Sequence, residues 1–218
     1  MFIFRPLVII KSMNNWKDLM DRITDPKIKV QHLTTSAKLH IAKRHCDKLR
    51  NLVPTKRAPD LVNIEFDKRN RIIFKPPTSL PSKIEDFYDE LEFIFYNLRS
   101  SIDSFLWETN LLLNLRLRST NFRRFLKRLN KEYKNQEITK LLSDLQKESW
   151  FEYLSEIRNN LIHRLFSEVA ISKDLKLYLP SKPKSGSFKL EKEFELLPCL
   201  DVLLGNVKRV LGKRIQDS

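Results

Sequence analysis

The feature that most constrains the fold is a run of apolar residues at steps of three and four, which continues from Ile84 to Leu113. Neither glycine nor proline interrupts this run, and Ser82 is well placed to cap the helix that the run predicts. At 1.5 Å per residue, this helix would be roughly 45 Å long, or about nine turns. A helix of that length needs partner helices along most of its apolar face. The pattern therefore predicts a helical bundle.

The same periodicity predicts shorter helices elsewhere in the chain. They cover residues 16–23, 35–52, 121–134, 136–147, 148–166 and 200–215. Thr35 or Ser36 is the expected N-cap of the helix at residues 35–52. Short β-prone segments predict two hairpins, one pairing residues 61–66 with 71–74 and the other pairing residues 175–179 with 188–194. We thus expect a mainly α fold, an up-and-down helical bundle with small β-hairpin additions.

A cluster of prolines precedes the long helix and suggests a boundary there. Pro76, Pro77 and Pro81 interrupt regular structure just before Ser82. We expect an N-terminal extension with a helix and a β-hairpin at residues 1–80, followed by the helical bundle at residues 81–218. The sequence leaves open whether the extension folds onto the bundle or moves separately.

The chain is strongly basic, which bears on its partners. Its 41 lysines and arginines outnumber 27 acidic residues, which gives a net charge of +14 over 218 residues. Such an excess favours a polyanion, most simply nucleic acid. The alternatives are a surface that happens to be basic, or an acidic protein partner. With only three glycines in the sequence, a glycine-rich phosphate loop is disfavoured.

Cysteine and histidine usage indicates neither a disulfide framework nor a metal site. Cys46 and Cys199 are isolated and are expected to be reduced thiols. His32, His40 and His45 have poor spacing for metal ligands on one helix face and are interpreted as incidental. No run approaches the ~20 apolar residues of a membrane span, and the start of the chain is a poor signal peptide. We expect a cytoplasmic protein with no cofactor and no membrane partner.

The hexapeptide Arg158-Asn159-Asn160-Leu161-Ile162-His163 is the most informative motif. An arginine can stabilise negative charge that develops on a phosphate, and a histidine can transfer protons near neutral pH. On an ideal helix, Asn159 and His163 share a face, whereas Arg158 and His163 point about 140° apart. One copy therefore cannot easily hold one phosphate between them, but two copies across a two-fold axis can. The alternative is a solvated His163 and an Arg158 that pairs with an acid such as Glu156.

This spacing resembles the Arg-x4-6-His signature of the HEPN superfamily, helical domains that include many ribonucleases of toxin–antitoxin, CRISPR and phage-defence systems. The resemblance covers mainly residues 82–168, and the stretch from Leu98 to Phe105 is also similar. It implies a homodimer with a composite active site and a metal-independent endoribonuclease that cleaves RNA by attack of the 2′-hydroxyl. Arg158 would stabilise the transition state, His163 would be general acid or base, and Asn159 would orient the phosphate or the histidine.

The resemblance also carries an alternative and a departure. The alternative is a non-catalytic HEPN module that binds nucleic acid, nucleotide or a protein partner; a third possibility is a basic DNA-binding helical protein. An antitoxin or other regulatory partner is expected for a toxin. Some antitoxin-paired members carry a tyrosine two residues after the histidine, and here that position is Leu165, which puts control by modification in doubt.

Basic residues concentrate between Arg116 and Lys134, where eight of them face a single acid, Glu132. We interpret this cluster as a track for an RNA backbone, and its aromatic residues as core. The RNA contacts expected there come from Arg116, Arg123, Arg124, Lys127 and Arg128. Arg99 and Asp103 lie on the long helix and could also reach the cleft, although an ion pair or capping role fits them equally well.

Overall fold

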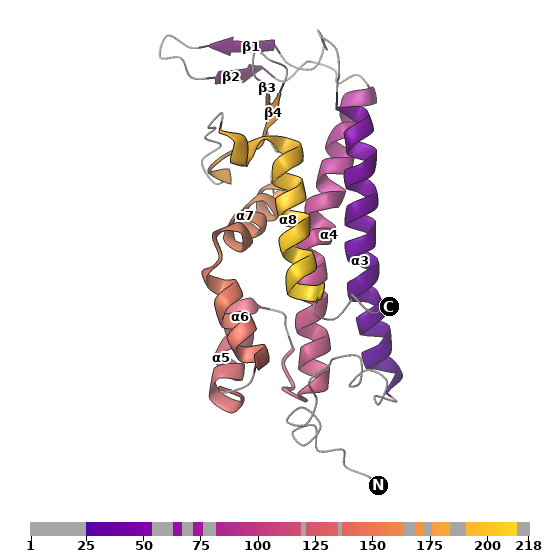
Figure 1. Cartoon of the computed structure of the whole chain (residues 1–218), viewed down its shortest axis with the longest axis vertical. Coiled ribbons are helices and arrows are strands. Elements are labelled where there is room, and N and C mark those ends of the chain that lie inside the picture. Colours follow the sequence, from indigo (N-terminus) through magenta and orange to yellow (C-terminus); the bar gives the residue numbers. More distant parts are fainter. Residues whose placement is uncertain are drawn as a thin grey trace.

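The computed structural model describes residues 25–53, 63–66, 72–75, 82–118, 121–134, 137–163, 169–171, 176–183 and 191–212. This part of the chain is mainly helical, with six α-helices arranged as a bundle (Figure 1). The helices are α3 (Pro26–Leu52), α4 (Ser82–Leu112), α5 (Phe122–Glu132), α6 (Glu137–Lys147), α7 (Ser149–His163) and α8 (Leu196–Gly212). The mainly α bundle expected from the sequence is confirmed. No helix in the described part is long and apolar enough to cross a membrane.

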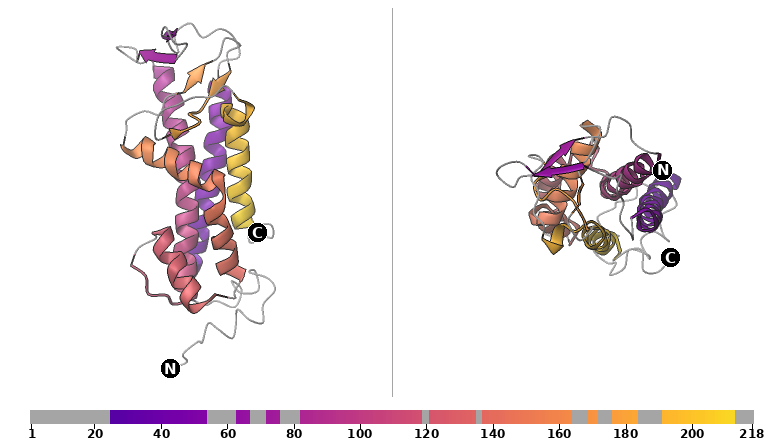
Figure 2. Two further views of the ribbon diagram at one scale, coloured as in Figure 1. Left: turned by 90° about the vertical axis from the view of Figure 1, so that its left-hand side faces the viewer. Right: turned by 90° about the horizontal axis from the view of Figure 1, so that it is seen from above.

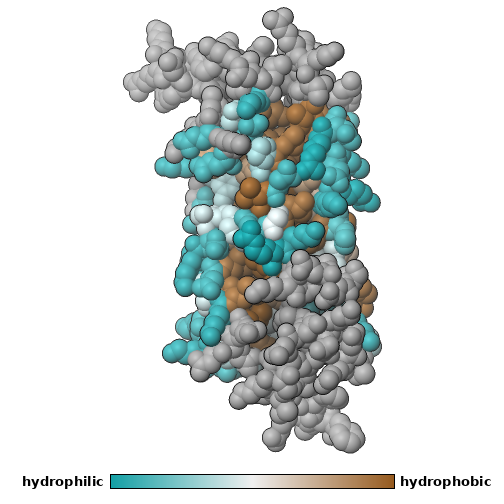
Figure 3. Space-filling view, in the orientation of Figure 1, coloured by the Kyte–Doolittle hydropathy of each residue, from teal (hydrophilic) through white to brown (hydrophobic). Residues whose placement is uncertain are grey.

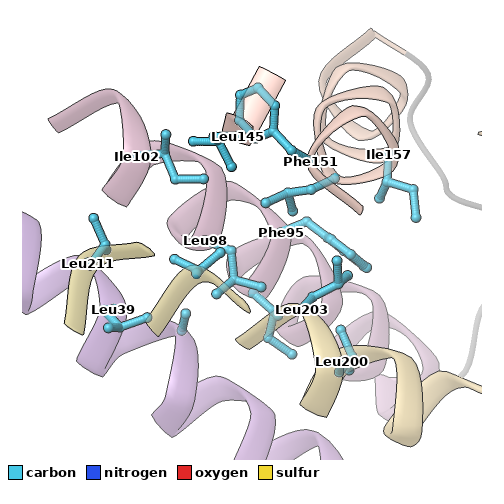
Figure 4. Close-up of a cluster of buried hydrophobic side chains, with 14 of the residues drawn as sticks. Leu39, Phe95, Leu98, Ile102, Leu145, Phe151, Ile157, Leu200, Leu203 and Leu211 are labelled. Carbon is cyan, nitrogen blue, oxygen red and sulfur yellow. The ribbon is translucent and has the colours of Figure 1, made fainter. Parts of the chain in front are cut away.

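Helix α4 is the uninterrupted helix that the apolar spacing predicts, and it forms the centre of the core. Phe95, Leu98 and Ile102 of α4 are completely buried. Figure 4 shows them in one buried cluster that also includes Leu39 of α3 and Leu203 of α8. Because α3, α7 and α8 each contact α4, its apolar face is covered along its length, as a helix this long requires.

Helix α3 begins nine residues before the predicted start at residue 35, so the expected cap at Thr35 or Ser36 was wrong. Asp25 is the N-cap, and its Oδ1 accepts a hydrogen bond from the Lys27 backbone N–H at 2.8 Å. Pro26 follows at the first helical position, where a missing N–H has no consequence. Thr35 lies inside the helix instead, and its hydroxyl donates to the Gln31 carbonyl at 3.0 Å.

Replacing Asp25 with alanine should lower the free energy of unfolding by about 1 kcal/mol, because the cap would leave an N–H of the first turn unsatisfied. Asp25→Ser should retain most of the stability, because a serine hydroxyl can accept the same bond. Urea unfolding of the two variants checks this. Equal stability of Asp25→Ala and wild type would mean that the cap contributes nothing.

Helices α3 and α4 pack along each other through a polar seam. His32 Nδ1 lies 3.2 Å from Glu108 Oε1, and His45 contacts Glu90 through its Nδ1. The sequence assigned neither histidine a role, yet each joins α3 to α4. Figure 2 shows the two helices side by side. The sequence left open whether the N-terminal part folds onto the bundle or moves separately, and its helix α3 packs onto the bundle. The division of the chain at residue 80 stays a prediction.

The strands are short additions to the bundle. Strands β1 (Asn63–Phe66) and β2 (Ile72–Lys75) form the predicted antiparallel hairpin. The second predicted hairpin is found only in part. Strand β4 (Leu177–Tyr178) pairs with β3 (Ala170–Ile171), and of the predicted partner segment the structure shows one backbone hydrogen bond, from the Leu179 N–H to the Phe194 carbonyl at 2.8 Å. Phe194 N–H donates to the Glu191 carbonyl at 2.9 Å, which winds that segment into the 3₁₀ helix η2 (Lys192–Phe194). Directly after η2, Glu195 forms an antiparallel bridge with Tyr178.

The other predicted boundaries agree closely where the structure describes them. Helix α8 starts four residues before the predicted Leu200. The ends predicted for α7 and α8, and the helix predicted at residues 16–23, lie outside the described residues. In Figure 3, hydrophobic side chains lie between two hydrophilic edges along the long axis, so this face is not uniformly polar.

Candidate nucleic-acid site on helix α7

The rotation of α7 about its own axis is fixed from two sides. Leu154 and Ile157 are completely buried within the core. The Tyr153 hydroxyl donates to the Pro180 carbonyl at 3.0 Å, and the Asn160 amide donates to the Pro183 carbonyl. Apolar packing and these two hydrogen bonds together fix which face of α7 meets the core.

Arg158 lies on the same face of α7 as Phe151, since seven residues on a helix return to within about 20°. It is half-buried, and its Nη1 donates to the Asn159 Oδ1 at 3.2 Å. This bond, and not an ion pair with Glu156, orients the guanidinium. Within the described residues, no carboxylate forms an ion pair with Arg158.

The Phe151 ring joins three helices close to this arginine. The Arg99 guanidinium of α4 lies over the ring, 5.1 Å from its centroid, and the Phe122 ring of α5 lies 4.8 Å away. Phe151 is buried by these contacts within its own chain.

Arg99 and Asp103 pair with each other rather than standing free. Arg99 Nη1 donates to Asp103 Oδ1 at 2.5 Å, one helical turn away, and only 13% of the Arg99 side chain is exposed. Of the two roles that the sequence left open for these residues, the structure shows the ion pair. Held by Asp103 and by Phe151, Arg99 contributes positive charge beside α7 but has little surface for direct contact with a ligand.

Sequence reasoning missed Lys38, which α3 brings close to Asp103 and Ser104 of α4. Its Nζ donates to the Ser104 hydroxyl at 2.8 Å across 66 residues of chain. Burial lowers the pKa of Lys38, and the charge of Asp103 opposes this shift. No local pattern could have indicated this lysine, because its contacts depend on how α3 packs on α4.

Helix α5 presents the predicted basic track. Asn121 caps it by accepting from the Arg124 backbone N–H at 3.1 Å, and Phe125, Leu126 and Leu129 are buried. The interpretation of its aromatic residues as core is therefore confirmed for Phe125. The basic side chains are exposed on the opposite face: Arg123, Arg124, Lys127, Arg128 and Lys131. Arg128 forms an ion pair with Glu132 at 2.6 Å.

Arg116 is exposed in the turn after α4 and has a φ of 57°, in the left-handed region that non-glycine residues rarely adopt. The Asn110 side chain holds this turn, since its amide donates to the Leu117 carbonyl and its oxygen accepts from the Leu117 N–H, both at 3.1 Å. The fold thus sustains an unfavourable backbone conformation at a residue predicted to contact RNA.

His163 is the last residue of α7, and its side chain lies outside the described residues. The helix does run continuously from Arg158 to His163, so the divergence of about 140° expected on an ideal helix applies to their Cα–Cβ directions. Within the described residues, no group of three His, Cys, Asp or Glu could hold a metal ion. No family model, no curated protein and no solved structure matches this chain.

Phe151→Leu should lower the free energy of unfolding by about 1–2 kcal/mol, because leucine fills most of the volume but loses the cation–π and ring contacts. Phe151→Ala should cost about 3–5 kcal/mol, since it also leaves a cavity. Chemical denaturation of both variants measures the two losses. A Phe151→Leu variant as stable as wild type would show that the aromatic contacts do not hold α4, α5 and α7 together.

Proposed function

We propose that this protein is a metal-independent endoribonuclease whose catalytic residues are Arg158, Asn159 and His163. The observation that carries the proposal is the state of Arg158. It is oriented by Asn159, has no carboxylate partner among the described residues, and lies beside a basic helix that Phe122 and Phe151 attach to α7. The motif itself and its HEPN-like spacing supply the remaining support.

The chemistry follows from these residue types. A base removes the proton from the ribose 2′-hydroxyl, and the 2′-oxygen attacks the adjacent phosphorus. The bond to the 5′-oxygen breaks and an acid protonates the leaving oxygen, which leaves a 2′,3′-cyclic phosphate and a 5′-hydroxyl. His163 would transfer one of these protons, and the Arg158 guanidinium would stabilise the charge that builds on the phosphate oxygens. Arg116, Arg123 and Arg124 would hold the flanking backbone, together with Lys127 and Arg128.

The divergence of Arg158 and His163 supports a composite site. Because their Cα–Cβ directions lie about 140° apart, a phosphate held by Arg158 of one copy is better reached by the histidine of a second copy. We therefore propose a homodimer. A toxin or phage-defence role, with a restraining antitoxin or a trigger, is proposed on the HEPN resemblance alone.

The decisive experiment compares two RNA substrates in the presence of EDTA. One is an all-ribose oligonucleotide, and the other carries a single 2′-deoxy sugar at the mapped cleavage position. We expect cleavage of the first, with cyclic-phosphate ends, and survival of the second at that position. Cleavage of both would rule out attack by the 2′-hydroxyl. Binding of both without cleavage would favour the alternative, a non-catalytic module that binds nucleic acid, nucleotide or a protein.

A further inference from the structure

The N-terminal half of α4 differs from the rest of this basic chain. Residues 84–98 contain five acids and no lysine or arginine. Two large rings on this stretch are also open to solvent, since Phe93 is 51% exposed and Tyr96 is 45% exposed. Glu90 pairs with His45 and Lys48 of α3, whereas Asp86, Asp89 and Glu92 form no ion pair within the described residues. Exposed aromatic residues beside such unpaired acids are typical of a surface that another molecule covers. We call this surface the acidic–aromatic face; its exposed members are Asp86, Asp89, Glu92, Phe93 and Tyr96.

The far half of α5 has the opposite character. Lys127, Arg128 and Lys131 are exposed there, and Glu132 is the only acid on the helix, already paired with Arg128. Arginine and lysine can pair with carboxylates and can also lie over aromatic rings. Inside this chain, Arg99 already lies over Phe151 in this way. We call these three residues the basic end of α5.

The two surfaces are arms that start from one point and run in opposite directions. Arg99 and Phe122 both contact Phe151, at the junction of α4, α5 and α7. From Arg99, ten residues of α4 lead back to Asp89, about 15 Å away. From Phe122, nine residues of α5 lead to Lys131, about 14 Å away. In the left view of Figure 2, the first half of α4 lies above α7 and α5 lies below it.

We propose that two copies of this chain associate through this side of the molecule, with the acidic–aromatic face of each copy against the basic end of α5 of the other. A two-fold axis through the α7 region places the first half of α4 of one copy opposite α5 of the other. Because the two surfaces extend nearly equally far from α7, both contacts form at once. The interface spans about 30 Å, enough for the roughly 800 Å² per partner of a stable complex.

This interface specifies how the homodimer of the proposed function assembles. Its existence does not depend on nuclease activity, and only its biological meaning rests on the proposed function. The axis passes near α7, so the two Arg158 residues come close together, and each approaches the other copy's motif helix. It also reassigns Lys127 and Arg128 from RNA to the second copy. Arg123 and Arg124, which follow Phe122 at the start of α5, remain available for the RNA backbone.

The test exchanges the charges of the two arms in the full-length chain, freed of nucleic acid, and measures mass in solution by sedimentation velocity. One variant carries Asp89→Lys and Glu92→Lys, and the other carries Lys127→Glu and Lys131→Glu. Each variant alone places like charges against like, so its dimer dissociation constant should rise by about 100-fold. An equimolar mixture of the two should form a dimer again, because both contacts are then complementary.

This rescue separates a broken interface from a damaged fold, since a misfolded variant would not be rescued by mixing. A matched control with Lys140→Glu and Lys147→Glu reverses two exposed charges on α6 and should remain a dimer. A monomeric wild type, unchanged association of either variant, or a mixture that stays monomeric would overturn the proposal. Association as predicted but without RNA cleavage would overturn the proposed nuclease activity and support the interface. Cleavage by a monomer would support the nuclease activity and overturn the interface.

Discussion

Replacing Arg158 with alanine should lower the rate of RNA cleavage by about a thousandfold and leave the fold intact. Within the described residues the guanidinium has no carboxylate partner, and its hydrogen bond is to the neighbouring Asn159. Because that bond is local and the side chain is half-buried at the surface, its loss should change the free energy of unfolding by no more than about 0.5 kcal/mol. Cleavage rates and urea unfolding measure the two effects separately.

Arg158→Lys should restore little of the lost activity, although it keeps the charge. A lysine ammonium cannot contact two phosphate oxygens with parallel N–H groups as the planar guanidinium does. His163→Ala should produce a loss of similar size, and the double variant should be hardly worse than either single variant, because the two groups act on the same step. All three variants should still bind RNA, since the α5 cations remain.

Arg209→Ala is the matched control, because Arg209 is an exposed arginine on α8. It should cleave like wild type. If Arg158→Ala also cleaved like wild type, the cleavage would come from a different site or from a contaminating nuclease. If Arg158→Ala lost RNA binding together with cleavage, Arg158 would be a binding residue and not a transition-state residue.

The sequence predicted those parts of the fold that depend on local periodicity. The steps of three and four in α4, and the alternation of basic and apolar residues in α5, specify which face of each helix is buried. They do not specify what covers that face. For Phe151 of α7, for example, the cover is Arg99 of α4 and Phe122 of α5.

Contacts between distant residues could not be predicted in this way. Lys38 and Ser104, or His32 and Glu108, are joined by how α3 and α4 pack, and nothing near either residue indicates its partner. The same applies to β3 and β4, whose two-residue strands are too short to show an alternating pattern. The candidate site depends on both kinds of information: the motif is local, whereas the packing around Phe151, on the same face of α7 as Arg158, comes from three helices.

Raising the pH from about 8 to about 11 should remove several kcal/mol from the free energy of unfolding, because three helices bury groups that must stay protonated. Burial raises the pKa of Cys46 on α3 and of Cys199 on α8 from 9.0 to about 12. Burial also raises the pKa of Tyr153 on α7, whose hydroxyl lies beside the Cys199 thiol. At alkaline pH the unfolded chain ionises these groups first and is stabilised relative to the folded chain.

The direction and size of this change in the free energy of unfolding follow from proton linkage. Each thiol contributes stability that is complete below pH 9, its unfolded pKa, and that is lost as the pH rises towards 12. At about 1.4 kcal/mol per pH unit and group, two units above pH 9 remove on the order of 2–3 kcal/mol for each thiol. Urea unfolding at a series of pH values should therefore show a steep alkaline decline. In a Cys46→Ala/Cys199→Ala variant the decline should be clearly shallower, although lysine and tyrosine titration is unchanged. Parallel declines in the two proteins would mean that the thiols ionise equally well in the folded and unfolded chains, and that burial at the contacts among α3, α7 and α8 does not protect them.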